Sequence, residues 1–212
     1  MARRLPVYIL VDVSGSMSGE KIVAVENGVQ TLVSALNNDP QAMESAYLSV
    51  ITFASNVEQL VPLTSLGQFN MPPLSAGGMT SMGEALSFVK KCADKEVQKN
   101  TPETKGDWKP LVFLMTDGES TDNLDRGIAE FKTRKWGIVV ACAAGIDANT
   151  AELSKITEAV VQLSTADSAA FAAFFKWVSA SIAAASASVG AANMEVSSID
   201  QLPPPPPEIT LV

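Results

Sequence analysis

The sequence predicts a doubly wound α/β domain with a mostly parallel sheet and helices on both faces. Two continuous apolar runs, at residues 7–11 and 111–115, are typical of strands buried on both faces of such a sheet. Segments with helical spacing of apolar residues alternate with β-rich runs along the chain, as this fold class requires. No internal repeat is present, which argues against solenoids and propellers. A chain of 212 residues that is 47% apolar is long enough for one such domain.

The elements are expected in the following order. After the first strand, a helix is predicted over residues 18–38, and Asp39-Pro40 ends it. The runs at 47–53 and 57–63 are separated by three residues, which is too few for a parallel crossover, so we expect an antiparallel hairpin. The pattern then predicts a helix at 81–98, a strand at 111–115, a helix at 124–135, a strand at 138–143, a helix at 151–157, a strand at 160–163 and a long helix after 167.

The domain is expected to occupy residues 1–189, followed by a Pro-rich C-terminal tail at 190–212. The tail contains five consecutive prolines and ends in a short apolar segment. The charge-poor stretch at 166–189 contains Lys176 and is mostly Ala and Ser, so no membrane span is expected. Near the N-terminus, Asp12 ends the apolar run too early for a secretory signal. A cytoplasmic location is therefore expected.

Composition excludes several function classes. The formal net charge of −8 argues against nucleic-acid binding through a basic face. The absence of histidine removes Ser-His-Asp and Cys-His chemistry as well as histidine zinc sites, and we expect the protein not to be an enzyme. Cys92 and Cys142 both lie in apolar stretches and are expected to be reduced core residues.

A metal site is predicted where the two apolar strands end. Asp12 ends the first strand and is followed by Ser14 and Ser16, and Asp117 follows the second strand. A carboxylate at such a position gains nothing from burial unless it is paired or bound to a metal. In a doubly wound sheet, ligands bind beyond the carboxyl ends of the strands, where strand order reverses. A glycine-containing turn can bring the Thr80 hydroxyl to the same edge.

Two carboxylates and three hydroxyls form an all-oxygen set. Such a set suits a hard cation, Mg²⁺ or Mn²⁺, and offers nothing soft enough for copper or zinc. With so few carboxylates the site would stay electropositive, and a carboxylate from outside would complete it. The expected partner is therefore a protein that supplies a Glu or Asp to the metal. Met17, Met79 and Met82 flank the site and are expected to form an adaptable apolar rim.

These motifs carry a family resemblance. Asp12-x-Ser14-x-Ser16, Thr80 in a Gly-Gly-x-Thr loop and Asp117 in Thr-Asp-Gly together resemble the metal-ion-dependent adhesion site of von Willebrand factor A domains. The resemblance covers residues 5–187 and implies a six-stranded sheet with one antiparallel edge strand. Within the family the chain looks similar to the intracellular bacterial TerY-like proteins of tellurium-resistance and stress-response clusters. That likeness implies a protein kinase or a PP2C-type phosphatase as a partner.

Three alternatives stay open at this stage. Asp12 and Asp117 can be ordinary capping and turn residues. A metal-dependent phosphatase or hydrolase could use Asp12 as its nucleophile, although haloacid-dehalogenase-like phosphatases would place a second carboxylate where this chain has Ser14. In the third alternative, the protein is a metal-independent scaffold that acts through the C-terminal tail.

Overall fold

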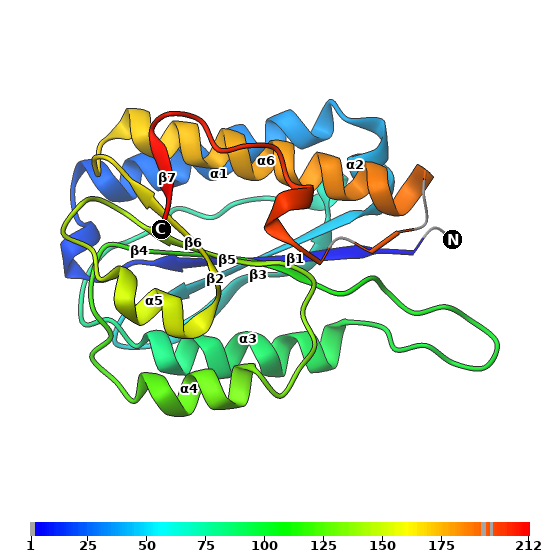
Figure 1. Cartoon of the computed structure of the whole chain (residues 1–212), viewed down its shortest axis with the longest axis horizontal. Helices are drawn as coiled ribbons and strands as arrows, with labels where there is room; N and C mark the ends of the chain where they lie inside the picture. The colour runs from blue at the N-terminus through cyan, green and yellow to red at the C-terminus, as the bar shows by residue number, and fades with distance from the viewer. Residues whose placement is uncertain (1–2, 192–193, 196) are drawn as a thin grey trace.

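Five parallel strands form the centre of one mixed, seven-stranded sheet in the computed structural model, which describes residues 3–191, 194–195 and 197–212 (Figure 1). The order across the sheet is β3-β2-β1-β4-β5-β6-β7. The strands are β1 (Leu5–Asp12), β2 (Ala46–Phe53), β3 (Val57–Ser65), β4 (Leu111–Thr116), β5 (Val139–Ala143), β6 (Ala159–Leu163) and β7 (Ile209–Leu211). The doubly wound fold class expected from the sequence is confirmed.

The two continuous apolar runs form the centre of the sheet. Every residue of β1 and of β4 is buried, because helices cover both faces at this point. The two strands are parallel neighbours, with Val7 opposite Leu111 and Val11 opposite Met115. Strand order reverses between them, since the chain proceeds from β1 towards β2 on one side and from β4 towards β5 on the other. Their carboxyl ends therefore meet at a topological switch point.

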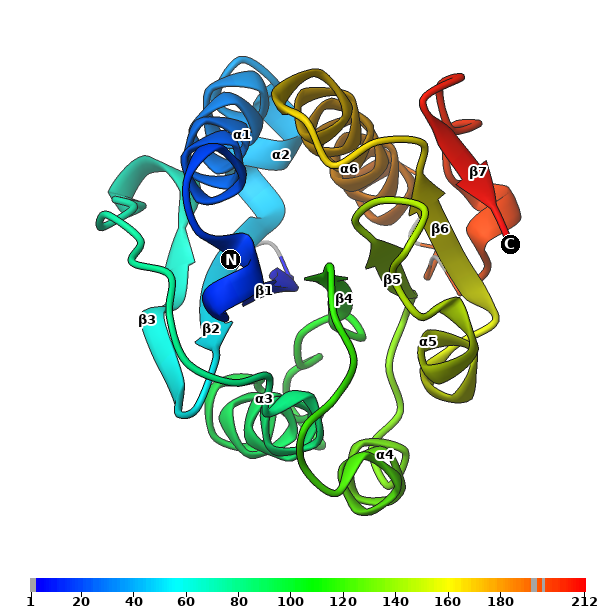
Figure 2. The same cartoon turned by 90° about the vertical axis from the view of Figure 1, so that its left-hand side faces the viewer.

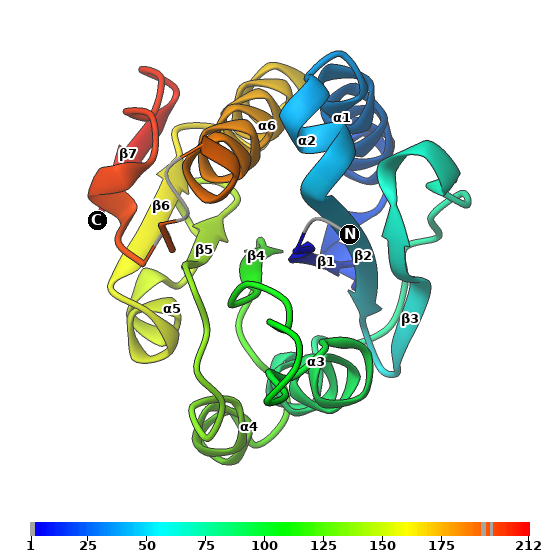
Figure 3. The same ribbon diagram turned by 90° about the vertical axis from the view of Figure 1, so that its right-hand side faces the viewer.

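The sheet separates two layers of helices (Figures 2 and 3). One face is covered by α1 (Glu20–Asn37), α2 (Pro40–Ser45) and α6 (Ser168–Ala191), and the other by α3 (Met82–Glu96), α4 (Leu124–Phe131) and α5 (Thr150–Ile156). Helices α1 and α6 pack very closely: a Cβ at Gly28 would lie 2.1 Å from the ring of Phe175. Any side chain at Gly28 would thus force the two helices apart.

Asp39 and Pro40 do more than end α1. The Asp39 carboxylate accepts hydrogen bonds from the backbone N–H groups of Gln41 and Ala42, so it caps α2. Pro40 occupies the first turn of α2, where a missing N–H costs no hydrogen bond. The sequence prediction treated this pair only as a stop and so missed the short helix.

The C-terminal segment adds a strand that the expected six-stranded sheet lacked. β7 pairs antiparallel with β6, with Ile209 opposite Leu163, so both edges of the sheet are antiparallel. Ile209 and Leu202 are buried, and the indole N–H of Trp177 donates to the carbonyl of Pro203 over 2.8 Å. The described part of the tail therefore packs on the domain. Residues 192, 193 and 196 of the expected tail lie outside the described residues.

Helix α6 combines length with an apolar composition. Among the described helices, only Ser168–Gly190 is long and apolar enough to cross a membrane by those two criteria, and 56% of its most apolar window is buried. One apolar stripe of this helix is buried against the sheet and α1: Phe171, Phe174, Phe175, Val178 and Ile182. Cys92 and Cys142 are free and buried, as expected.

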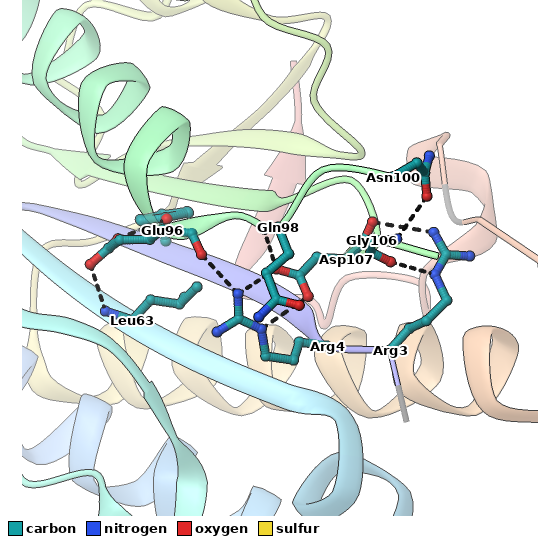
Figure 4. Close-up of polar contacts among 9 residues, drawn as sticks. Arg3, Arg4, Leu63, Glu96, Gln98, Asn100, Gly106 and Asp107 are labelled. Atoms are coloured by element: carbon teal, nitrogen blue, oxygen red, sulfur yellow. Dashed lines mark hydrogen bonds and ion pairs between the residues drawn. The ribbon is translucent and has the colours of Figure 1, made fainter. Parts of the chain in front are cut away.

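Two N-terminal arginines anchor the long loop between α3 and β4, which extends to the right in Figure 1. The Arg4 guanidinium donates to both carboxylate oxygens of Asp107, at 2.9 and 2.6 Å, and to the carbonyl of Glu96 (Figure 4). Arg3 donates to the Gly106 carbonyl over 2.7 Å and stacks on Trp108. The side chain of Asp107 is only 2% exposed, so Arg4 is the cation that offsets the cost of burying this carboxylate.

Candidate metal centre

Asp12 is the last residue of β1, and its side chain is held from the loop after β1 and from β4. Asp12 is fully buried, with 0% of its surface exposed. One carboxylate oxygen accepts the Ser14 backbone N–H at 2.8 Å, and the other accepts the Thr116 hydroxyl at 2.5 Å. Thr116 ends β4, the neighbouring strand. Both oxygens are therefore oriented by neutral donors, and the carboxylate has no cation of its own in these contacts.

The pKa of Asp12 is raised by this environment. Burial is the main cause, because the interior disfavours the charged form, and the negative charge of Asp117 adds to it. The hydrogen bonds from Ser14 and Thr116 oppose the shift without cancelling it. A bound cation would favour the ionised carboxylate, so this residue is poised to gain from one.

A chain of hydroxyls links the loop after β1 to the loop after β4. The Ser14 and Ser16 hydroxyl oxygens are 3.0 Å apart, and the Ser16 hydroxyl donates to Asp117 over 2.6 Å. Residues Gly15–Met17 form a single 3₁₀ turn, and the fully buried Met17 side chain anchors it. The side chain of Asp117 is only 2% exposed. Four of the five predicted residues thus form one connected group.

The loop before α3 is joined to the same turn by backbone hydrogen bonds. The Gly15 N–H donates to the Gly78 carbonyl at 3.0 Å, and the Gly77 N–H donates to the Val13 carbonyl at 2.8 Å. Gly78 has a φ of +82°, a conformation that other residues rarely adopt. These two glycines bring the third loop alongside the end of β1.

Thr80 is placed by the loop that follows β4. Its backbone N–H donates to the Thr121 hydroxyl at 3.0 Å, and its carbonyl accepts the Thr121 N–H at 2.8 Å. A Cβ at Gly118 would lie 3.8 Å from the Thr80 hydroxyl oxygen and 3.9 Å from that of Ser16. The two hydroxyls therefore border the same space beside Gly118. The structure brings all five predicted side chains together at the carboxyl edge of the sheet, the edge that faces the viewer in Figure 2.

The donor chemistry of this group fits a hard divalent cation. In the described part of the chain, no group of three or more His, Cys, Asp or Glu side chains could hold a metal, so a site here depends on hydroxyl oxygens. Oxygen-only sets of this kind suit Mg²⁺ or Mn²⁺. A cation already lies at the site: the Lys21 ammonium is 2.5 Å from Asp117. The carboxylate thus attracts positive charge in this structure.

Sequence reasoning assigned no positioning role to three residues that arrange this site. Thr116 orients Asp12, Thr121 holds the Thr80 backbone, and Lys21 pairs with Asp117. A lysine in the first turn of a helix opposes the helix macrodipole, and this signal could have drawn attention to Lys21. Thr116 stands in the Thr-Asp-Gly motif, whereas Thr121 gave no comparable signal.

The prediction that three methionines form an apolar rim around the site is wrong for two of them. Met17 and Met82 are fully buried, because they pack into the core on opposite faces of the sheet. Met79 is 59% exposed in the loop that carries Thr80, and it is the only one of the three that a partner could touch.

The family model of the von Willebrand factor type A domain matches residues 7–176. The chain belongs to this family. No curated protein matches the chain in sequence. Among solved structures, this von Willebrand factor A (VWA) domain is similar to proximal thread matrix protein 1 from the mussel byssus, with a TM-score of 0.64 and 20% identity over 84% of this chain and 48% of that one. A further structure of the mussel protein, at 19% identity, has zinc in its metal-ion-dependent adhesion site (MIDAS) motif.

Two bacterial structures are also similar. A von Willebrand factor type A protein from Catenulispora acidiphila gives a TM-score of 0.60 and 20% identity over 86% of this chain and 43% of that one. The pilus adhesin SpaC of Lactobacillus rhamnosus GG gives a TM-score of 0.67 and 14% identity over 86% of this chain and 31% of that one. The VWA domain thus spans less than half the length of these relatives. At such identities the likeness shows the fold.

Proposed function

We propose that this VWA domain is a metal-dependent protein-interaction module. Its site would hold Mg²⁺ or Mn²⁺ and bind a Glu or Asp of a partner protein. The observation that carries the proposal is the convergence of five oxygen-bearing side chains from three loops at the switch point of the sheet: Asp12, Ser14, Ser16, Thr80 and Asp117. VWA domains are typically interaction modules of this kind, which supports the same function.

The charges of the site support capture of an acidic group. A divalent cation would supply positive charge at the edge of the sheet, where Asp12 and Asp117 are its only carboxylate ligands. The three hydroxyl ligands are neutral, so the bound cation would still favour a further negative ligand. The exposed Met79 side chain offers an apolar contact beside it.

We propose further that the domain catalyses no reaction. A nucleophilic aspartate needs access to its substrate, whereas Asp12 is fully buried and both of its oxygens accept hydrogen bonds. Ser14 stands where a phosphatase of the alternative class would need an acid–base carboxylate. An assay with a generic aryl phosphate and Mg²⁺ tests this point. Hydrolysis by the wild type that disappears in Asp12→Asn would establish the phosphatase instead.

The finer proposal concerns the cellular setting. The likeness of the chain to TerY-like proteins supports a role in a cytoplasmic bacterial complex for tellurium resistance or stress response, with a protein kinase or a PP2C-type phosphatase as partner. The net charge of −8 supports a protein partner over nucleic acid. We do not expect a membrane-spanning role for α6, because its aromatic stripe is buried against the sheet.

Isothermal titration with Mg²⁺ tests the site directly. We expect Asp12→Ala to abolish binding and Thr80→Ala to weaken it, with circular dichroism confirming that both variants fold. Asp147→Ala is the matched control, because it removes the same charge from an exposed position outside the five ligands. Mg²⁺ affinity that is unchanged in folded Asp12→Ala protein would refute the proposal. Parallel titrations with Mn²⁺ and Zn²⁺ would rank the cations.

Capture from a lysate of the source organism tests the partner. Immobilised wild-type protein is compared in Mg²⁺ and in EDTA, with Thr80→Ala in parallel, and retained proteins are identified by mass spectrometry. The proposal expects a protein retained only by the wild type with Mg²⁺. Retention that ignores both the metal and the mutation would assign binding to another surface, with the C-terminal segment examined first.

A further inference from the structure

Lys21 occupies an electrostatically unfavourable place on its own helix. It is the second residue of α1, in the first turn, where the helix macrodipole favours acidic side chains and disfavours cations. Its ammonium nevertheless turns towards the sheet and lies 2.5 Å from Asp117, a residue 96 positions away in sequence. An attraction specific to Asp117 is therefore needed to account for its position.

The two carboxylates of the site are satisfied in different ways. Asp12 receives only neutral donors, from Ser14 and Thr116. Asp117 receives the neutral Ser16 hydroxyl on one oxygen and the charged Lys21 ammonium on the other. Asp117 is therefore the carboxylate whose charge the protein itself neutralises.

We propose that Lys21 is an internal counter-cation that neutralises Asp117 in the metal-free protein and must leave it when a divalent cation binds. The inference rests on the proposed function, since it concerns the regulation of the same site. An ammonium and a dication repel each other strongly when they share one buried carboxylate. The Asp117 side chain is 2% exposed and fixed at the end of β4, whereas that of Lys21 is 31% exposed on a flexible stem. Lys21 is thus the group that can move into solvent.

Two consequences follow for the site. The metal-free state is stabilised, because the Lys21 ammonium offsets the repulsion between Asp117 and Asp12. Metal binding has to displace Lys21, so the ion pair weakens the apparent affinity for the cation and raises the concentration at which the site fills. After displacement, the ammonium remains near the rim of the site, where it adds positive charge for an incoming acidic side chain.

Mg²⁺ titration of Lys21 variants tests the inference. Lys21→Gln keeps a long polar side chain but removes the charge, and we expect it to tighten Mg²⁺ binding roughly three- to tenfold, the range for loss of one competing ion pair. Lys21→Arg retains a cation and should stay close to wild type. Lys176→Gln, at an exposed position in α6, makes the same change in net charge and is the control.

Thermal melting gives a second readout that does not depend on metal affinity. In EDTA, Lys21→Gln should melt at a lower temperature than the wild type, because Asp117 has lost its counter-cation. In saturating Mg²⁺ this difference should disappear. Lys176→Gln should show no such dependence on metal.

The outcomes separate the two proposals. Tighter Mg²⁺ binding by Lys21→Gln, or binding by this variant alone, supports the role of Lys21. Equal or weaker binding by Lys21→Gln, with binding by the wild type, overturns that role and leaves the metal-dependent function standing. An absence of Mg²⁺ binding in both proteins overturns both proposals.

Discussion

The Thr116 hydroxyl donates to the Asp12 carboxylate over 2.5 Å, between residues 104 positions apart at the ends of neighbouring strands. Thr116→Val removes this donor with almost no change in shape. We expect Mg²⁺ binding to weaken about 10- to 100-fold, as for other residues that orient a metal ligand. Thr116→Ser keeps the hydroxyl and should bind nearly as well as wild type in the same titration. A valine variant with wild-type affinity would show that Asp12 needs no such support.

Asp12→Asn should abolish Mg²⁺ binding and yet stabilise the metal-free protein. Burial raises the pKa of Asp12 above its unfolded value, so the folded state binds the proton more tightly than the unfolded chain. The protonated form therefore contributes stability that is fully present below the unfolded pKa and is lost as pH rises through the folded pKa, whereas a neutral Asn has no charge to bury at any pH. Urea unfolding in EDTA at pH 7 is the measurement. A lower midpoint for Asp12→Asn than for wild type would contradict the prediction.

Arg4→Met should destabilise the protein by about 2 kcal/mol, because it leaves a nearly buried carboxylate at Asp107 without its partner. The figure is below that for a fully buried pair, since the Arg4 side chain is 22% exposed. Arg126→Met serves as the control, because its ion pair with Glu130 is exposed. Chemical unfolding gives the comparison. Mg²⁺ affinity should stay unchanged in Arg4→Met, because Arg4 precedes β1 at the amino end of the sheet, away from the site.

Truncation before residue 197 should lower stability by roughly 2–4 kcal/mol, because it exposes the edge of β6 and removes the buried Leu202 and Ile209 side chains. Thermal melting in EDTA measures the loss. Mg²⁺ binding should persist in the truncated protein at a temperature where it stays folded. Loss of partner capture with intact Mg²⁺ binding would favour the scaffold alternative.

Alkaline pH should weaken the fold through its buried thiols. Burial raises the pKa of Cys92 to about 11 and raises that of Cys142 as well. Both thiols contribute full stability below their ordinary pKa of 9.0, and this contribution is lost as pH rises towards the folded values. The free energy of unfolding should therefore fall as pH rises from about 9 to about 11. In Cys142→Ala the fall should be smaller, and an equal fall would assign the effect to other groups.

Much of the fold could be predicted because its signals are local. The continuous apolar runs of β1 and β4 predicted the centre of the sheet, and helical spacing predicted five of the six helices. The short helix α2 was missed because the same Asp39-Pro40 signal serves as an end and as a beginning. β7 was missed because three residues carry too little periodicity, and only the open edge of β6 makes them a strand.

The sequence by itself determined the fold class and named the five candidate oxygen ligands, because each candidate lies beside an element whose pattern is in its own residues. Only the tertiary structure decided how those ligands are satisfied. The pairings of Thr116 with Asp12 and of Lys21 with Asp117 depend on strand order and on the direction in which α1 leaves the sheet. Such contacts join residues about a hundred positions apart, and no local periodicity encodes them, since they form only after the layers have packed.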